Sequence, residues 1–420
     1  MLPIKFVRAN WHLLAFGWMM LFCSSVGQTY FISIFGGLIR NDFGLSHGAY
    51  GTCYSIGTLA SAGVLLWAGR LVDRQSLVTF SVGAIAGLAA AATLMAGASG
   101  ALTLTLAFFL LRFFGQGLLT HAAMTAMGRY FSAERGRAVS IAALGHVAGE
   151  AVLPLLAVTA LTLVPWRGIW LLSSAFLIVC AVPIVILLLR GAGAKTYSNG
   201  WSWSSDSVSP GNSPTQGIVS RMRDFTLSDA LRDIGLYLRL PVLLAPSFIS
   251  TGLIFHQVHI GTAKGWSLTL IASSLTIFAA GSLVMMIVAG QLVDHFTARR
   301  LVPYCLAPLA TACAILAFSD ATLGALVFFG LLGVGSGLTA VILGAIWAEL
   351  YGITHLGAIR AFGASAMVFS SGLAPVAMGL LIDGQWGVPA IALGCTIYCV
   401  AAATLSISAP TRAQSWGSRT

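Results

Sequence analysis

The chain has 420 residues, of which 58% are hydrophobic and only 8% are charged, and its mean hydropathy is +0.91. A soluble domain carries roughly 25% charged residues, so this composition excludes an ordinary soluble protein. The net charge of +10 would suggest nucleic acid in a soluble protein, but here we expect basic residues in the loops on one side of a bilayer and no nucleic-acid partner. The seven cysteines lie almost entirely in apolar runs and form no C-x-x-C pair, so they predict neither a disulfide framework nor a metal site.

Twelve apolar runs follow one another along the chain, and each is a transmembrane helix candidate. They lie near 12–35, 49–68, 77–97, 102–126, 138–163, 168–189, 240–262, 267–289, 301–318, 322–348, 361–382 and 388–408. The first run follows Lys5 and Arg8 and is too long for the core of a signal peptide, so we expect it to be a retained helix. The predicted fold class is an all-α polytopic membrane protein with twelve transmembrane helices.

Two ionisable residues lie deep inside the fourth and fifth runs. Arg112 is roughly ten residues, or about 15 Å, from the start of its helix, and Glu150 is about 18 Å up the next one. Both therefore lie near the bilayer midplane, where a charged side chain is a functional-site hypothesis by default. Arg112 and Gln116, one helical turn away, are suited to hold a carboxylate. Glu150 is suited to carry a proton, which His146 could share from the same helical face.

A structural interpretation of these residues stays open beside the functional one. Arg112 and Glu150 could form a buried ion pair that only ties two helices together, and an incoming anion or proton could also break such a pair. His146 is more readily a packing histidine, because the G-x-x-x-G spacing of Gly145 and Gly149 lets another helix approach closely.

Residues 191–239 separate two six-helix halves, 1–190 and 240–420. The beginning of this segment is rich in Ser and Gly and predicts a flexible linker. Thr226 and Asp229 near its end have the spacing to cap a short helix at the membrane surface.

The two halves repeat in sequence. GRLVDR, at 69–74, returns about 220 residues later as GQLVDH at 290–295, and GQGLLT at 115–120 returns at a similar offset as GSGLTA at 335–340. Internal repeats with a binding site at their midplane interface are typical of transporters, so the halves are predicted to be pseudo-symmetric.

With these motifs the chain resembles the major facilitator superfamily over essentially its whole length. GRLVDR and GQLVDHFTARR are similar to the superfamily's loop signature, which implies a latch that holds the outward-facing state through a carboxylate at a helix N-terminus. The residues expected in this latch are Gly69, Asp73, Arg74, Arg129, Gly290, Asp294, Arg299 and Arg360.

A narrower resemblance is to the bacterial monocarboxylate and oxalate/formate-exchanger-like branch. It rests on GQTYFISIFGGLI in the first run, RFFGQG in the fourth and ELYGITHLGAIRA after the tenth. The branch's anion transporters carry a basic residue in helix 8, and the oxalate exchanger a lysine in helix 11, whereas 268–289 and 362–382 contain none at depth here. Helices 1, 4, 7 and 10 line the cavity in the superfamily, which implies a substrate-binding role for Gln28, Tyr30, His256 and Gln257.

The sequence thus predicts a secondary active transporter of a small organic anion, a monocarboxylate, that works by alternating access with proton coupling or by exchange. Two alternatives stay open, efflux of amphipathic drug-like molecules and a non-transporting membrane sensor on a transporter fold. No nucleotide-binding glycine loop, H-E-x-x-H or G-x-S-x-G motif is present, so we expect no enzyme, cofactor or metal. The expected partners are a small-molecule substrate, the lipid bilayer and protons, for a monomer in the bacterial inner membrane.

The distribution of basic residues predicts the orientation. Between the runs, only Arg40, Arg167 and Lys264 fall on one side of the membrane, and the many others fall on the side of the termini. Both termini and the 191–239 segment should therefore face the cytoplasm. Reporter fusions at Ser204 and at the C-terminus should give a cytoplasmic signal, and a periplasmic signal at either site would overturn this orientation.

Overall fold

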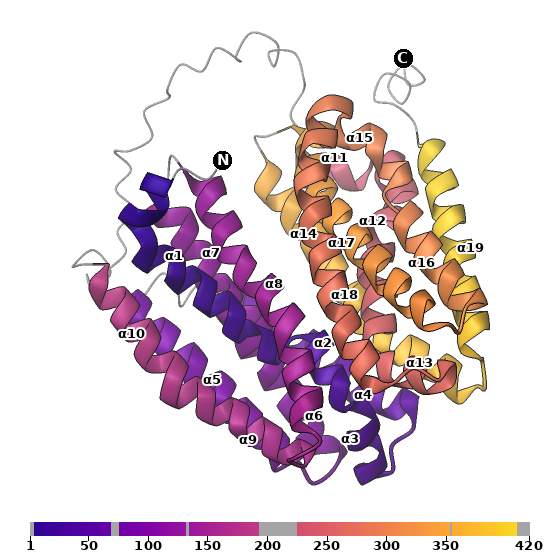
Figure 1. The fold of residues 1–420 in the computed structure, drawn as a ribbon. Helices are drawn as coiled ribbons and strands as arrows, with labels where there is room; N and C mark the ends of the chain where they lie inside the picture. The colour runs from indigo at the N-terminus through magenta and orange to yellow at the C-terminus, as the bar shows by residue number, and fades with distance from the viewer. Residues whose placement is uncertain (1–3, 69–74, 132–133, 193–224, 353–354, 410–420) are drawn as a thin grey trace.

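The computed structural model describes residues 4–68, 75–131, 134–192, 225–352 and 355–409, and within these ranges every regular element is helical. The chain forms two groups of helices that lie side by side, coloured indigo to magenta and orange to yellow in Figure 1. The predicted all-α class is confirmed. The predictions for Gly69, Asp73 and Arg74 and for the Ser- and Gly-rich part of the linker concern residues outside the described ranges.

The N-terminal half contains the first six predicted runs. Its elements are α1 (Ile4–Ser24), η1 (Ser25–Gly27), α2 (Thr29–Ile32), η2 (Ser33–Phe35), α3 (Gly36–Phe43), α4 (His47–Ala68), α5 (Leu77–Ala96), α6 (Ala101–Leu110), η4 (Leu111–Leu119), α7 (Thr120–Tyr130), α8 (Arg135–Ala160), α9 (Trp166–Phe176), η5 (Leu177–Ala181) and α10 (Val182–Gly191).

The C-terminal half contains the other six. Its elements are α11 (Leu227–Leu231), α12 (Ile234–Phe255), α13 (Gln257–Lys264), α14 (Leu268–Phe296), α15 (Ala298–Leu301), η9 (Val302–Tyr304), α16 (Ala307–Phe318), α17 (Thr322–Tyr351), α18 (Leu356–Asp383) and α19 (Val388–Ile407).

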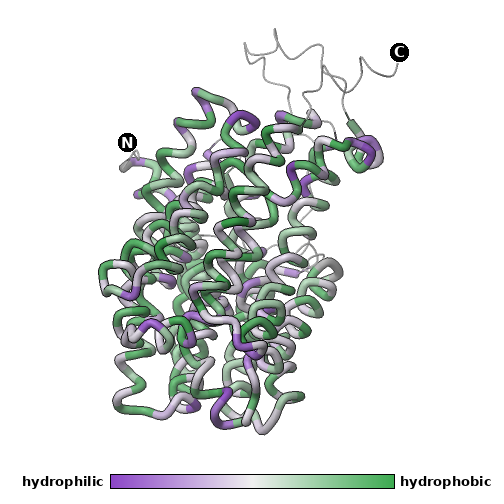
Figure 2. Tube along the Cα trace, turned by 90° about the vertical axis from the view of Figure 1, so that its right-hand side faces the viewer, coloured by the Kyte–Doolittle hydropathy of each residue, from purple (hydrophilic) through white to green (hydrophobic). Residues whose placement is uncertain are grey.

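Ten helices in the described ranges are long and apolar enough to cross a membrane, or eleven if the bent pair that contains α1 and α3 counts as one span. The remaining predicted run, 49–68, corresponds to α4. Hydrophobic residues dominate the helices in Figure 2, and many hydrophilic ones lie at the two ends of the bundle. Because the outward faces of these helices are apolar, their natural surroundings are lipid rather than water.

Several boundaries differ from the prediction, and those of the first run, predicted at 12–35, differ most, because its helical segments extend from Ile4 in α1 to Phe43 in α3. Helix α12 begins at Ile234, inside the segment expected to be linker, because the Asp233 side chain accepts the N–H of Gly235 and starts the helix there. Helix α14 continues to Phe296, so Gly290 and Asp294 lie in its last turns and not in a loop. The short helix expected after Thr226 is confirmed as α11, with Thr226 and Asp229 bonded to each other's backbone N–H groups.

The N-terminal half is held together by helices that approach closely at glycines. A Cβ added to Gly115 of η4 would lie 2.7 Å from the Gly27 Cα, and a Cβ on Gly145 or Gly149 of α8 would overlap Trp18 or Ser25. These glycines allow η4 and α8 to pack directly on the first helix, which confirms the close approach predicted from the G-x-x-x-G spacing.

The two halves meet at one end of the bundle, opposite the chain termini (Figure 1). We call this the closed end and the other the termini end. Among the described residues, every hydrogen bond between the halves lies nearer the closed end than the termini end. Gln257 bonds to Ser33, for example, and Thr276 bonds to Ala151. The structure is therefore a state in which the halves are joined at the closed end.

Candidate functional site

Arg112 lies at the start of η4, a wider π-helical segment in the middle of the long span formed by α6, η4 and α7. Short π-helical segments inside α-helices are frequent at functional sites, because the wider turn displaces side chains from their α-helical positions. The Arg112 side chain points into the N-terminal half and is only 4% exposed. Gln116, four residues later, is exposed. The wider turns of η4 replace the α-helical spacing from which a face shared with Arg112 was predicted, so contact of Gln116 with substrate stays a prediction.

Neutral groups from two other helices surround the Arg112 guanidinium. Its Nη1 donates to the Gly27 carbonyl and to the Thr29 hydroxyl, each at 3.4 Å, which is long for such bonds. The Tyr54 ring lies 5.5 Å from the guanidinium carbon, within cation–π range, and the Tyr54 hydroxyl lies 2.7 Å from that of Thr29. The Arg112 Nε has no hydrogen-bond partner in the described structure.

The Gly27 carbonyl is available because the first helix is broken at this point. Gln28 has extended backbone angles, and the segments before and after it form a bent pair with an angle of 43°. Broken helices of this kind present backbone groups to a site at membrane depth, as in transporters whose binding sites lie at the midplane. Gln28 is partly exposed at the break, and the next turn directs Thr29 to Arg112.

Glu150 occupies a second buried position, on α8, and is 7% exposed. The Tyr30 and Ser25 side chains are its neighbours on the first helix, since Tyr30 interacts with Glu150 electrostatically and Ser25 packs against Gly149. His146, one turn earlier, is partly buried, and its ring lies edge-on to Tyr30 with 5.8 Å between the centroids. Glu150, His146 and Tyr30 thus form a cluster separate from the groups that contact Arg112.

The open question of an Arg112–Glu150 ion pair has a clear structural answer. Within the described ranges Arg112 forms no ion pair, and Glu150 forms neither an ion pair nor a side-chain hydrogen bond. A buried charge without a counter-ion is costly in a membrane, and in this state neither residue has a described ion-pair partner that would offset that cost.

The helix that begins the C-terminal half is also broken, between α12 and α13 at His256. His256 and Gln257 are both buried beyond this break. The His256 Nε2 lies 3.0 Å from the Pro375 carbonyl, and the Gln257 amide donates across the interface to the Tyr30 carbonyl and the Ser33 hydroxyl. In this state both belong to the contact between the halves, and their predicted role in substrate binding stays a prediction.

Asp383 at the end of α18 connects the two halves at the closed end. Its two carboxylate oxygens accept the backbone N–H groups of His47, at 2.9 Å, and Gly48, at 2.8 Å, in the first turn of α4. A carboxylate at a helix N-terminus satisfies free N–H groups and is favoured by the helix dipole. The His47 ring adds contacts with His259, at 4.3 Å between centroids, and with His256, at 5.7 Å.

Aromatic residues continue this contact toward Arg112. The Phe255 ring of α12 lies 4.9 Å from Tyr50 and 4.5 Å from Tyr54 of α4. Tyr54 therefore contacts the C-terminal half through Phe255 and the Arg112 cluster through Thr29 and the guanidinium. Tyr54, His47 and Asp383 could not be singled out from the sequence, because their roles depend on tertiary contacts. His47 and Asp383 are 336 positions apart, and Tyr54 lies against Phe255 of the other half.

Comparison with known proteins decides the family. The family model of the Major Facilitator Superfamily matches residues 17–255 and 242–419. The chain belongs to this superfamily. Its fold is that of secondary transporters that work by alternating access, and it is not an enzyme. No curated protein matches the chain.

Solved structures of superfamily transporters share this fold. A bacterial homolog of the human lysosomal transporter Spinster, in an inward-facing and unoccupied conformation, has a TM-score of 0.71 and 14% identity over 95% of this chain and 96% of its own. The inward-facing and occupied conformation of such a homolog gives a TM-score of 0.66 and 13% identity over 96% of each chain. At this identity the similarity shows the fold alone.

The described residues of the predicted superfamily latch lie at the termini end. Asp294 and Arg360 are exposed there, and Arg299 follows α14 in the short helix α15. Arg129 is exposed at the end of α7. No hydrogen bond joins the halves at this end within the described ranges. The latch is predicted for the outward-facing state, in which the halves would meet at the termini end, so it stays a prediction.

The Asp383 contact yields a test of the closed end. Asp383→Ala removes both acceptors. The population with the closed end open should rise about five-fold, because a helix-terminal acceptor contributes about 1 kcal/mol. The measurement is the distance distribution between spin labels at Asn41 and Ala263, one on each half, in a variant without native cysteines. Asp383→Asn is the matched control, because its amide oxygen still accepts one N–H and the shift should be smaller. Identical distributions for all three proteins would contradict this role.

Proposed function

We propose that the protein transports a small organic anion, a monocarboxylate, with Arg112 as the carboxylate-binding residue and Glu150 as the proton carrier. The observation that carries the proposal is the buried Arg112 guanidinium, which contacts only neutral groups among the described residues. A carboxylate would supply the missing counter-ion in the planar, two-point geometry that arginine favours.

The Arg112 surroundings are suited to binding that is reversible. The two hydrogen bonds that it makes are long, and its Nε makes none in the described structure, so donors remain to be matched by a ligand. The break at Gln28 and the wider turn of η4 place these donors beside the Gly27 carbonyl at membrane depth. A transported anion must be held tightly enough to replace its water but loosely enough to leave, and incompletely matched donors meet both needs.

The position of Glu150 supports its proposed role as the proton carrier. It is an acidic side chain deep in the membrane, buried on α8 without a counter-ion in the described ranges. Protonation removes the cost of burying its charge, whereas exposure to water allows the proton to leave. Tyr30 and His146 beside it are neighbours through which protonation could be linked to movement of the first helix. A symport mechanism follows if proton and anion bind in the same state, and an exchange mechanism if they alternate.

With both termini in the cytoplasm, as the basic residues predict, the described state is closed toward the periplasm. Its closed end is the one held by Asp383 and Gln257. In this orientation it would take up or release substrate on the cytoplasmic side.

Arg112→Lys tests the substrate site. The ammonium group keeps the charge but cannot form two parallel bonds to a carboxylate, so affinity for the transported anion should fall at least ten-fold. The measurement is a thermal-shift screen of the purified protein with small carboxylates, followed by uptake of any hit into proteoliposomes. Thr29→Val is the matched control for a merely structural role, since it removes the hydroxyl beside Arg112 but leaves the guanidinium. Normal anion binding by Arg112→Lys would favour the drug-efflux alternative instead.

Glu150→Gln tests the proton carrier. The amide keeps the shape of the side chain but cannot titrate, so accumulation driven by a pH gradient should be abolished while counterflow of substrate continues. The measurement compares these two modes of transport in proteoliposomes, with the melting temperature as a control for folding. A variant that folds normally and still accumulates substrate against its gradient would contradict the proton-carrier role. Binding of a carboxylate without any flux in the wild-type protein would favour the sensor alternative.

A further inference from the structure

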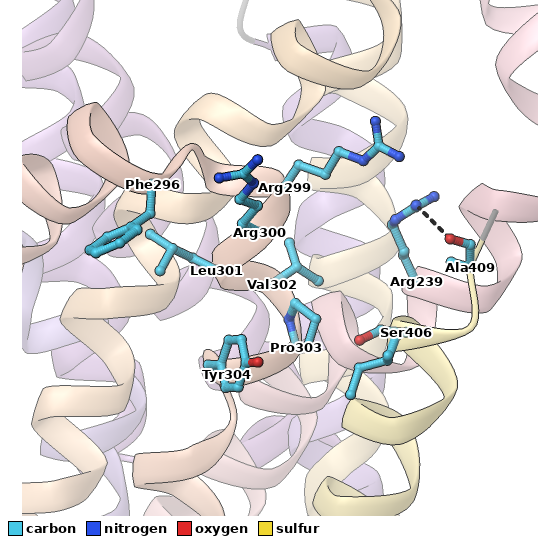
Figure 3. Close-up of a pocket in the computed structure, with 11 residues that line it drawn as sticks. Arg239, Phe296, Arg299, Arg300, Leu301, Val302, Pro303, Tyr304, Ser406 and Ala409 are labelled. Carbon is cyan, nitrogen blue, oxygen red and sulfur yellow. Dashed lines mark hydrogen bonds between the residues drawn. The ribbon is translucent and has the colours of Figure 1, made fainter. Parts of the chain in front are cut away.

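A cavity of about 600 Å³ lies at the termini end of the C-terminal half, away from the Arg112 and Glu150 clusters. It is lined by the start of α12, the α14–α15–η9 connection and the end of α19 (Figure 3). Helix α19 is at the edge of the bundle in Figure 1, and its Leu405 and Ile407 side chains are exposed and apolar. The cavity therefore opens on a flank that faces lipid, at the level of the membrane surface.

Among the described residues, three arginines line this cavity and no acidic residue does: Arg239 from α12 and Arg299 and Arg300 from α15. Arg239 is buried and donates to the Gly235 and Ala409 carbonyls, and it interacts electrostatically with Asp233. The Arg299 and Arg300 side chains form no hydrogen bond or ion pair within the described part of the chain. Like charges around one cavity repel, and an anion in it would relieve that repulsion.

The backbone that carries Arg299 and Arg300 is fixed in place. Thr297 has φ of 70°, a conformation that β-branched residues rarely adopt, and it ends α14 with a sharp change of direction. Glu349 of α17 then accepts the N–H groups of Ala298 at 2.8 Å and of Arg299 at 2.9 Å. Because this connection is held from a second helix, the two arginines are presented to the cavity in a pre-organised position.

The charged and apolar parts of the cavity are separated. In Figure 3 the three guanidinium groups lie along its upper rim, on the side to which the chain continues beyond α19, whereas Pro303, Tyr304 and Ser406 lie below. Tyr304 is 67% exposed, and Phe296 and Ile407 are exposed as well. A ligand that fits this arrangement has an anionic group toward the cytoplasmic surface and an apolar part toward the membrane interior.

We propose that this cavity binds an anionic phospholipid from the leaflet on the termini side, with its phosphate between Arg239, Arg299 and Arg300 and its acyl chains against Tyr304 and Ile407. Arginine clusters at the membrane surface bind lipid phosphates, and tyrosine favours the interface. The chain's own C-terminal segment is a poorer occupant, because residues 410–420 carry Arg412 and Arg419 and no acidic side chain. A soluble phosphate would leave the apolar side of the cavity unmatched.

The test uses the full-length protein in detergent and dioleoylphosphatidylglycerol as the probe, with binding measured by native mass spectrometry and by thermal shift. The double variant Arg299→Gln with Arg300→Gln should lower the apparent affinity for this lipid about ten-fold or more. Arg190→Gln with Arg232→Gln is the matched control, since it removes two exposed charges at the same end of the bundle but outside the cavity. Its affinity should stay within two-fold of the wild type.

Two further measurements distinguish the source of the phosphate. Tyr304→Ser should weaken binding of phosphatidylglycerol but leave any effect of inorganic phosphate unchanged, and phosphatidylcholine should bind more weakly than phosphatidylglycerol. Equal lipid affinity in the arginine double variant and the wild type would overturn the proposal. Stabilisation by inorganic phosphate as large as that by the lipid would also overturn it, because the acyl chains would then contribute nothing.

Discussion

A guanidinium buried at membrane depth, with no acidic partner among the residues that the structure describes, is the constraint around which the N-terminal half is built. Arg112 is stabilised by the Gly27 carbonyl, the Thr29 hydroxyl and the face of Tyr54, which come from the first two helices of the half. Each of these groups is neutral, and none replaces the counter-ion that a buried cation normally requires. The break of the first helix at Gln28 and the wide turn of η4 both serve to bring these groups to Arg112. These two local irregularities, the break at Gln28 and the wide turn of η4, therefore meet at Arg112.

The same cluster is connected to the contact between the halves. Tyr54 lies against Arg112 on one side and against Phe255 of the C-terminal half on the other. Beyond Phe255 the helix breaks at His256, and Gln257 bonds to the first helix of the other half. If the halves separate at the closed end, Tyr54 loses Phe255 and Tyr30 loses Gln257. The surroundings of both Arg112 and Glu150 would then change together, as coupled binding of an anion and a proton requires.

The sequence was sufficient for the class of protein, the boundaries of most helices and the burial of Arg112 and Glu150, because hydrophobic runs and isolated charges within them have one physical explanation in a membrane. It was not sufficient for their relation to each other. Helical rise predicts how deep a residue lies in the membrane but not toward which neighbouring helix its side chain points. The Arg112–Glu150 ion pair could therefore be neither predicted nor excluded from the sequence. The π-helical segment carries no sequence signal of its own. The cap from Asp383 to His47 depends on tertiary structure, since the two residues are 336 positions apart.

The two halves repeat in fold but differ in how their charges are distributed. Within the described ranges, the Asp, Glu, Lys and Arg residues of the C-terminal half lie near the ends of its helices, at the closed end as with Asp383 and Lys264, or at the termini end as with Arg239 and Glu349. Among the described residues, an arginine and a glutamate at mid-depth, Arg112 and Glu150, occur in the N-terminal half alone. Under the proposed mechanism, substrate and proton would therefore both be held by one half, while the other closes over them from either end. In such a mechanism the half that only closes the site requires no buried charge, and carrying one in the membrane would cost several kcal/mol.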